Sequence, residues 1–225
     1  MLLLDYAAIL ARDQGGCRFL QKKMEEGNEE VINKIFEHTI DGFFDLMNDP
    51  FGNYLAQKIT ETVKAAYLTE IIKKVNCDPV GLCRNSHGTR SIQKIIDVVK
   101  KPEQIELLSS YLKENVQELA EDINGNHVIQ KILQSWPPTH NQFIYDAMMA
   151  KCVEIACHKH GCCVMQKCID GANPQQKLAL TLRIGDHTQV FVRNPYGNYV
   201  VQYVLELKMM EVNQRIGQKL LGSLL

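Results

Sequence analysis

Apolar residues recur along this chain at spacings of one, three and four residues. One such group contains Val128, Ile129, Ile132 and Leu133, and an equivalent group begins at Val200. This spacing places the apolar side chains along one face of an α-helix. The pattern therefore predicts short amphipathic helices at these places.

Longer stretches between these helices have the same periodicity and cover residues 29–47, 65–75 and 103–120. In the last stretch, Ile105 and Leu108 begin an apolar row that continues at intervals of three and four residues. No segment has the strict alternation that is typical of a half-buried strand. The pattern as a whole predicts an all-α fold.

Glutamines mark an internal repeat. They occur at intervals of 36, 36, 37, 36 and 36 residues, at Gln21, Gln57, Gln93, Gln130, Gln166 and Gln202. A glycine stands five residues before each of them, at Gly16, Gly52, Gly88, Gly125, Gly161 and Gly197. A period of this length is typical of solenoids, in which stacked helical units bury one continuous core. The predicted repeats cover residues 1–27, 28–64, 65–101, 102–137, 138–173 and 174–209, with a partial seventh over 210–225.

A helix-capping residue precedes each glutamine by eight positions. The residues there are Asp13, Asp49, Asn85, Asp122, His158 and Asn194, and all except the histidine are favoured N-cap types. Pro50 and Pro195 follow directly in two repeats, and proline is favoured at the first residue of a helix. The glutamine helix is therefore predicted to begin seven residues before the glutamine.

Two further positions repeat on this helix. Four residues before each glutamine stand Cys17, Asn53, Thr89, Asn126, Cys162 and Asn198. Three residues before it stand Arg18, Tyr54, Arg90, His127, Cys163 and Tyr199. Residues four apart are neighbours on a helix surface, so each repeat presents a polar pair with another side chain beside it.

These residue types suit the recognition of single-stranded RNA. Two amides can satisfy the acceptor–donor–acceptor edge of uracil, and one glutamine beside a small residue leaves room for adenine. Arginine, tyrosine and histidine have planar faces that stack on bases. Asparagine is also unfavourable inside a helix, yet it alternates with small residues along the repeats, for which packing gives no reason. The opposing interpretation is a structural ladder of glutamines beside ordinary surface residues.

Charged residues follow the glutamines at fixed positions. Lysine comes directly after the glutamine at Lys22, Lys58, Lys94, Lys131 and Lys167. An acid stands four residues after it at Glu25, Glu61, Asp97, Asp170 and Glu206. A lysine and an acid three residues apart are predicted to be neighbours on a solvated helix surface.

Composition adds few constraints. The 225 residues are 45% hydrophobic and 23% charged, with a net charge of −1, so bulk charge does not indicate a nucleic-acid partner. Any RNA site must depend on the local arrangement of charges. The apolar runs are too short for a membrane span, and the N-terminus lacks a signal-peptide pattern. We expect a soluble, cytoplasmic monomer without membrane association.

The eight cysteines contain no C-x-x-C pair. Cys152, Cys157 and Cys162, with His158 and His160 nearby, leave a zinc site over residues 152–168 as an alternative. The favoured interpretation is reduced thiols that pack as small apolar side chains, with no metal and no cofactor. Phosphate-binding loops and nucleophile elbows are also lacking, so an enzyme is not expected.

Four strings carry a resemblance to a known family. The segments 16–21, 51–57, 124–130 and 196–202 resemble the base-reading helices of the Pumilio (PUF) family of RNA-binding proteins. The resemblance implies a crescent-shaped, right-handed superhelical α-solenoid of three-helix repeats. It also implies that each repeat binds one RNA base on the concave face, so the site residues are those at the glutamine and at the two positions before it.

The family's recognition code pairs asparagine and glutamine with uracil, and a small residue and glutamine with adenine. With the N-terminal repeat at the 3′ end, the resemblance implies the site 5′-UAUAUA-3′. In the third repeat Thr89 replaces the cysteine or serine that is commoner at adenine positions. In the fifth repeat Cys163 replaces the usual stacking arginine, so this repeat should hold its base weakly. The family's usual seventh and eighth repeats, which read a 5′ UG, are absent, so this chain is either a fragment or a short natural form.

The implied function is post-transcriptional regulation of mRNA, by translational repression or decay, through sites in 3′ untranslated regions. Repressor or deadenylase proteins would then bind the convex face. Two alternatives stay open. One is a protein-binding α-solenoid similar to armadillo or HEAT arrays. The other is a nucleolar relative that binds structured RNA during ribosome assembly.

Overall fold

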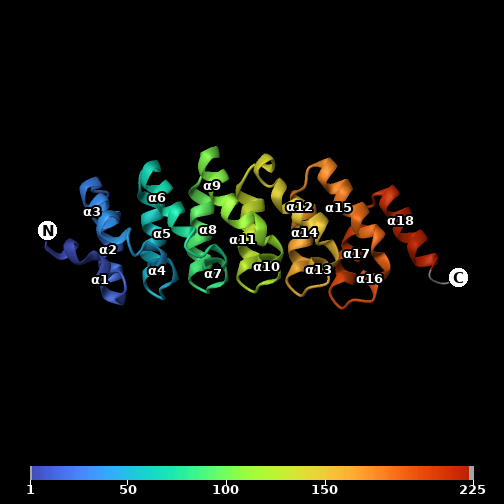
Figure 1. Ribbon diagram of the computed structural model, residues 1–225, viewed down its shortest axis with the longest axis horizontal. Coiled ribbons are helices and arrows are strands. Elements are labelled where there is room, and N and C mark those ends of the chain that lie inside the picture. The colour runs from blue at the N-terminus through green and yellow to red at the C-terminus, as the bar shows by residue number, and fades with distance from the viewer. Residues whose placement is uncertain (1, 223–225) are drawn as a thin grey trace. The chain divides into compact units, whose positions relative to one another are not determined.

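The structure of the protein is a computed structural model that describes residues 2–222, with side chains from residue 4 onward (Figure 1). Every regular element among the described residues is helical, which confirms the all-α prediction. Residues 223–225, the end of the predicted partial seventh repeat, lie outside the described residues, as does Met1. The chain divides into two compact units, residues 1–114 and 115–225.

The N-terminal unit begins with a 3-10 helix at Leu2–Tyr6 and continues with helices of three kinds. The short helices are α1 (Ala7–Leu10), α4 (Phe43–Asn48) and α7 (Pro79–Arg84). The glutamine helices, which carry the repeated glutamines, are α2 (Gln14–Glu25), α5 (Gly52–Thr62) and α8 (Gly88–Val98). The connecting helices are α3 (Glu29–Thr39), α6 (Ala65–Val75) and α9 (Pro102–Leu112).

The C-terminal unit has the same three kinds of helix, after a 3-10 turn at Lys113–Asn115. Its short helices are α10 (Val116–Glu121), α13 (Cys152–Ala156) and α16 (Thr188–Val192). Its glutamine helices are α11 (Gly125–Ser135), α14 (Gly161–Gly171) and α17 (Gly197–Glu206). Its connecting helices are α12 (Gln142–Ala150), which follows a 3-10 turn at Pro138–His140, α15 (Pro174–Asp186) and α18 (Met210–Leu221).

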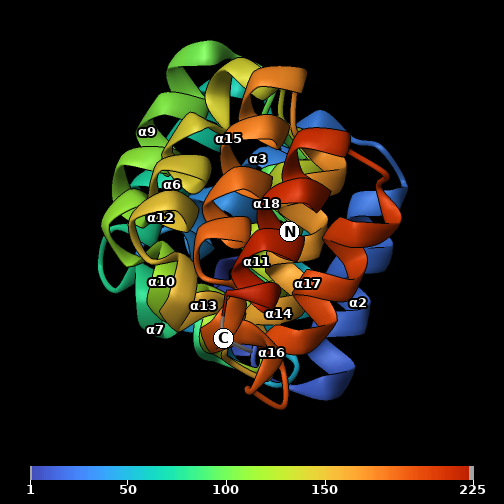
Figure 2. The same cartoon turned by 90° about the vertical axis from the view of Figure 1, so that its right-hand side faces the viewer.

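Within each unit the glutamine helices lie side by side. In the N-terminal unit α5 packs between α2 and α8, and in the C-terminal unit α14 packs between α11 and α17 (Figure 1). The last helix, α18, packs against α15, α16 and α17 and faces the viewer in Figure 2. Stacking of equivalent helices buries their apolar rows, as the repeat period predicts.

Two of the longer stretches predicted to be helical each form two separate helices. Residues 29–47 form α3 and α4, and residues 103–120 form α9 and α10 with a 3-10 turn between them. The buried residues Leu112, Val116 and Leu119 keep a helical spacing across the second division. Apolar periodicity alone therefore does not reveal where one helix ends and the next begins. The third stretch, residues 65–75, coincides with α6.

The N-cap prediction is confirmed for Asp13 of α2, whereas in the other five glutamine helices the predicted residue lies in the turn before the helix and the helix begins later than predicted. The Asp49 carboxylate accepts hydrogen bonds from the backbone N–H groups of Phe51 (2.9 Å) and Gly52 (2.7 Å). Regular helix starts at the glycine, five residues before the glutamine, in every glutamine helix except α2. The prediction that Pro50 and Pro195 are first helical residues is wrong, because both lie in the turn before the helix.

The repeated glycines allow close contact between two helices of the same repeat. A Cβ atom added at Gly161 would lie 2.1 Å from the carbonyl oxygen of Ile155, near the end of α13. The equivalent distance from Gly88 to the carbonyl oxygen of Leu82 is 2.5 Å. Any larger residue would push the short helix away from the first turn of the glutamine helix.

No helix in the described part of the chain is both long and apolar enough to span a membrane.

Replacing Gly161 with alanine should lower the free energy of unfolding by about 1–3 kcal/mol, because the Cβ would overlap the Ile155 carbonyl. Gly217 is a matched control inside α18, where an added Cβ has no neighbour within 4 Å. There the alanine should raise stability by about 0.5–1 kcal/mol, because it favours the helix. Urea unfolding of both variants checks this, and equal effects at the two sites would contradict the contact.

Candidate nucleic-acid interface

In each glutamine helix the side chains at the three repeated positions differ in their exposure to solvent in a similar way. The residues three before the glutamine are all exposed: Arg18, Tyr54, Arg90, His127, Cys163 and Tyr199. The residues four before it are buried at Cys17, Asn53, Thr89, Asn126 and Cys162, and half-buried at Asn198. The glutamines are half-buried, except for the exposed Gln202. Because equivalent helices pack side by side, each unit carries three such sets on neighbouring helices.

The glutamine is hydrogen-bonded to its polar partner in five of the six repeats. Its amide nitrogen donates to the side chain four residues earlier in the pairs Gln21–Cys17 (3.1 Å), Gln57–Asn53 (3.1 Å), Gln93–Thr89 (3.1 Å), Gln130–Asn126 (2.8 Å) and Gln202–Asn198 (3.2 Å). Each of these bonds uses the amide nitrogen of the glutamine, so the glutamine carbonyl oxygen takes no part in the pair. The geometry therefore leaves an acceptor available in each pair.

The asparagines have a local structural role. The side-chain amide of Asn126 donates to the carbonyl oxygens of Asp122 (2.8 Å) and Ile123 (2.8 Å) in the preceding turn. Asn53 donates in the same way to Asp49 (2.9 Å) and Pro50 (3.0 Å). Both asparagines are the second residue of their helix, so the argument from poor propensity in a helix interior is wrong.

These turn contacts limit how the asparagines can meet a base. Both N–H groups of the Asn126 amide are directed to backbone carbonyls, and its oxygen already accepts from Gln130. The oxygen keeps capacity for one more donor. The asparagine therefore orients the glutamine and offers an acceptor, rather than acting as a freely rotating amide.

A cavity of about 390 Å³ opens between the first two glutamine helices, α2 and α5. Its lining includes the predicted residues Cys17, Arg18, Gln21 and Tyr54. Gln14, Pro50 and Phe51 complete the lining and were not predicted. An aromatic residue directly before the repeated glycine, as at Phe51 and Tyr196, is the signal that could have indicated this part of the wall. The volume is in the range of small-ligand sites.

Neighbouring repeats also contact each other through the exposed row. The Arg90 guanidinium donates to the Tyr54 hydroxyl at 3.5 Å, which joins the predicted stacking residues of α5 and α8. The Cys17 thiol donates to the backbone carbonyl of Phe51 at 3.1 Å. Successive sets in the N-terminal unit are thus in direct contact.

The fifth repeat differs from the others. Gln166 donates at 3.5 Å to the backbone carbonyl of Tyr199 in the next repeat, and no bond joins it to Cys162. The Cys162 and Cys163 sulfurs lie 4.0 Å apart. Burial raises the pKa of the Cys162 thiol to about 11, so this thiol is neutral at physiological pH. The exposed Cys163 has no planar group with which to stack on a base.

The charged residues pair differently from the prediction in two repeats. Lys58 pairs with Glu25 of the preceding glutamine helix, with 3.4 Å between Nζ and Oε1. Lys94 pairs with Glu61 in the same way. The predicted pair within one helix occurs at Lys167 and Asp170, which are 3.7 Å apart. Side-by-side packing brings an acid of the preceding glutamine helix within reach of Lys58 and of Lys94.

The residues considered for zinc are not gathered into a set of ligands in the part of the chain that the structure describes. The rings of His158 and His160 are 5.9 Å apart, and the His158 Nδ1 atom accepts the backbone N–H of His160 at 3.3 Å. No group of three or more potential ligands occurs among the described residues. All eight cysteines are free, and burial raises the pKa of Cys152 to about 12.

Comparison with known sequences gives repeated matches along the chain. The sequence model of the Pumilio-family RNA binding repeat matches residues 6–40, 42–75, 80–110, 115–149, 151–184 and 191–216. These stretches begin near the short helices, whereas the predicted repeat boundaries fall before the connecting helices. Both divisions follow the same period.

An individual relative also belongs to this family by its name. Pumilio homolog 12 of Arabidopsis thaliana is 40% identical over 217 residues, which are 95% of this chain and 36% of that protein. This chain thus spans about a third of the length of that relative.

Solved structures are also similar. A Puf4 RNA binding domain bound to an HO endonuclease RNA 3′ UTR recognition sequence has a TM-score of 0.85 at 40% identity, covering 88% of this chain and 62% of that one. The RNA-binding domain of yeast Puf5p bound to MFA2 RNA has a TM-score of 0.88 at 36% identity, covering 96% and 62%. The fold is that of RNA-binding solenoids, and the chain belongs to the Pumilio family of RNA-binding repeat proteins.

Proposed function

We propose that this chain binds single-stranded RNA with sequence specificity and reads 5′-UAUAUA-3′, one base per repeat, with the first repeat at the 3′ end. The observation that supports this most is the repeated set of a hydrogen-bonded polar pair beside an exposed side chain. That set recurs on adjacent helices in each unit, so successive bases meet equivalent groups.

The free acceptors agree with these two bases. Uracil offers its imino N–H, and adenine offers its exocyclic amine, to a glutamine carbonyl oxygen. The buried residue four positions before the glutamine then determines which of the two bases fits. Asn126 fills space and accepts one N–H of the Gln130 amide, so the second N–H of that amide can donate to a uracil carbonyl oxygen, whereas the smaller Cys17, Thr89 and Cys162 leave room for a purine. Alternating partners therefore favour alternating uracil and adenine.

The exposed residues supply stacking surfaces. Tyr54 is 50% exposed and Tyr199 is 55% exposed, so their rings are accessible to a base. Stacking on an aromatic ring contributes about 1–3 kcal/mol per base with little sequence preference. In this arrangement stacking provides affinity, and the polar pairs provide specificity.

We further propose that the chain acts in post-transcriptional regulation in the cytoplasm, as a monomer that binds 3′ untranslated regions of mRNA. Repression or decay would then follow from repressor or deadenylase proteins that it recruits. Support comes from the Puf4 relative, whose bound RNA is a 3′ UTR recognition sequence.

Replacing Tyr54 or Tyr199 with alanine should weaken binding to a UAUAUA oligonucleotide about tenfold or more, because one stacking surface is lost. Fluorescence anisotropy with a labelled oligonucleotide measures the change. Tyr6→Ala is the control, because Tyr6 is 57% exposed but lies outside the glutamine helices. Unchanged affinity in both site variants would contradict the proposal.

The double variant Asn126→Ser with Gln130→Glu should shift the third nucleotide of the site from uracil toward guanine. A glutamate carboxylate can accept both donors on the guanine edge, following the serine and glutamate pair of the family's code. Competition between UAUAUA and UAGAUA oligonucleotides measures the shift. A variant that still prefers uracil would rule out the assigned register.

The same variant should lose stability, since serine cannot reach both turn carbonyls that Asn126 binds. The expected loss is about 1–3 kcal/mol, the usual cost of leaving buried polar groups unpaired. Asn126→Ala alone should lose a similar amount, and Gln130→Ala should lose less. Urea unfolding of these single variants separates the effect on stability from the change in base preference.

A further inference from the structure

Two lysines lie beside the predicted stacking side chains. Lys58 is four residues after Tyr54, and Lys94 is four residues after Arg90, so each pair lies one turn apart on the same side of its helix. Each lysine also directly follows a glutamine of the base-reading set. These cations therefore lie within one helical turn of the residues that the proposed function places against the RNA.

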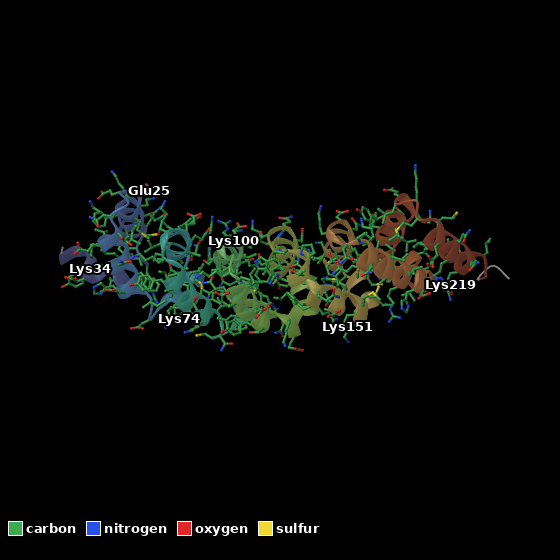
Figure 3. All side chains as sticks on the ribbon, turned by 90° about the horizontal axis from the view of Figure 1, so that it is seen from above. Glu25, Lys34, Lys74, Lys100, Lys151 and Lys219 are labelled. Atoms are coloured by element: carbon green, nitrogen blue, oxygen red, sulfur yellow. The ribbon has the colours of Figure 1, made fainter. Side chains whose placement is uncertain are left out.

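Both lysines are already paired with an acid of the preceding repeat. The Lys58 ammonium lies 3.4 Å from the Glu25 carboxylate, and Lys94 is paired and hydrogen-bonded with Glu61. The lysine side chains are 26% and 27% exposed, and the acids are 62% and 41% exposed. Glu25 projects at one edge of the N-terminal unit, away from Lys74 at the other edge (Figure 3).

The C-terminal unit has a neutral version of the same contact. Tyr203 occupies the position after Gln202 and donates its hydroxyl to Asp170 of the preceding helix. This hydrogen bond, with a smaller contribution from burial, raises the pKa of Tyr203 to about 12, so the phenol is uncharged at physiological pH. In this contact a phenol takes the place of the lysine, and Asp170 also pairs with Lys167 of its own helix.

We propose that Glu25 and Glu61 are specificity determinants, because they neutralise the lysines that flank the stacking residues. Attraction between lysine and phosphate is independent of sequence and increases the affinity for every RNA. A lysine that keeps its acid partner adds little to that attraction. The chain then distinguishes RNAs through base contacts, in agreement with its net charge of −1. This inference rests on the proposed function.

The test is the double variant Glu25→Gln with Glu61→Gln, which removes the acid partner on the preceding helix from both lysines and keeps the shape of both side chains. The logarithm of the RNA affinity falls linearly with the logarithm of the salt concentration, with a slope of about −0.7 for each phosphate that a lysine contacts on a single strand. Two additional lysine contacts should therefore make this slope steeper by about 1.4. From about 50 to 200 mM salt the variant should then lose about sevenfold more affinity than the wild type. At low salt its preference for UAUAUA over a scrambled oligonucleotide of the same composition should fall.

The matched control is Glu103→Gln with Glu106→Gln. These exposed acids lie on α9, which packs on α6 and α7, and the variant has the same change in net charge. It should keep the slope of the wild type. Glu25→Gln alone should give about half of the full change, and urea unfolding verifies that each variant is folded.

The outcomes separate the two proposals. A wild-type chain without preference for UAUAUA would contradict the proposed function. A wild type with that preference, together with a double variant whose salt slope is unchanged or matches the control, would overturn the role of the two glutamates. A loss of affinity at every salt concentration would also overturn it, because the ion pairs would then be holding the helices in position.

Discussion

The close contact between each short helix and the first turn of its glutamine helix is the constraint on which the repeat depends. Only glycine permits this approach at Gly161 and Gly88, where a carbonyl oxygen occupies the place of a side chain. The contact determines where the glutamine helix can begin. It also brings the turn carbonyls near the second helical residue, where the Asn53 and Asn126 amides bind them.

The first turn of the glutamine helix also positions the glutamine side chain. Because the Asn126 amide is held by the turn, its oxygen has a defined place and orients the Gln130 amide. The side chain that stabilises the turn is therefore also the one to which the proposed function assigns a role in recognition. Replacing such a residue to change base preference also changes the turn, and the two effects have to be measured separately.

The outer surface of the glutamine helices combines exposed stacking groups with neutralised charge. Tyr54 and Arg90 contact each other across two repeats, and Lys58 and Lys94 are paired with acids of the preceding helix. This pattern explains how a chain with a net charge of −1 can present a surface for RNA. In the proposed mode of binding, affinity depends on stacking and polar contacts, whose strength varies little with salt, rather than on phosphate attraction.

The sequence by itself determined the all-helical fold and the repeat period. It also determined the capping residues and the repeated positions on the glutamine helices, because all of these follow from spacing along one chain. Family membership also followed from those residues. Only the tertiary structure decided where the helices begin, why each repeat needs glycine and which acid pairs with Lys58 and Lys94. Those features depend on distances between helices, and apolar periodicity contains no information about them.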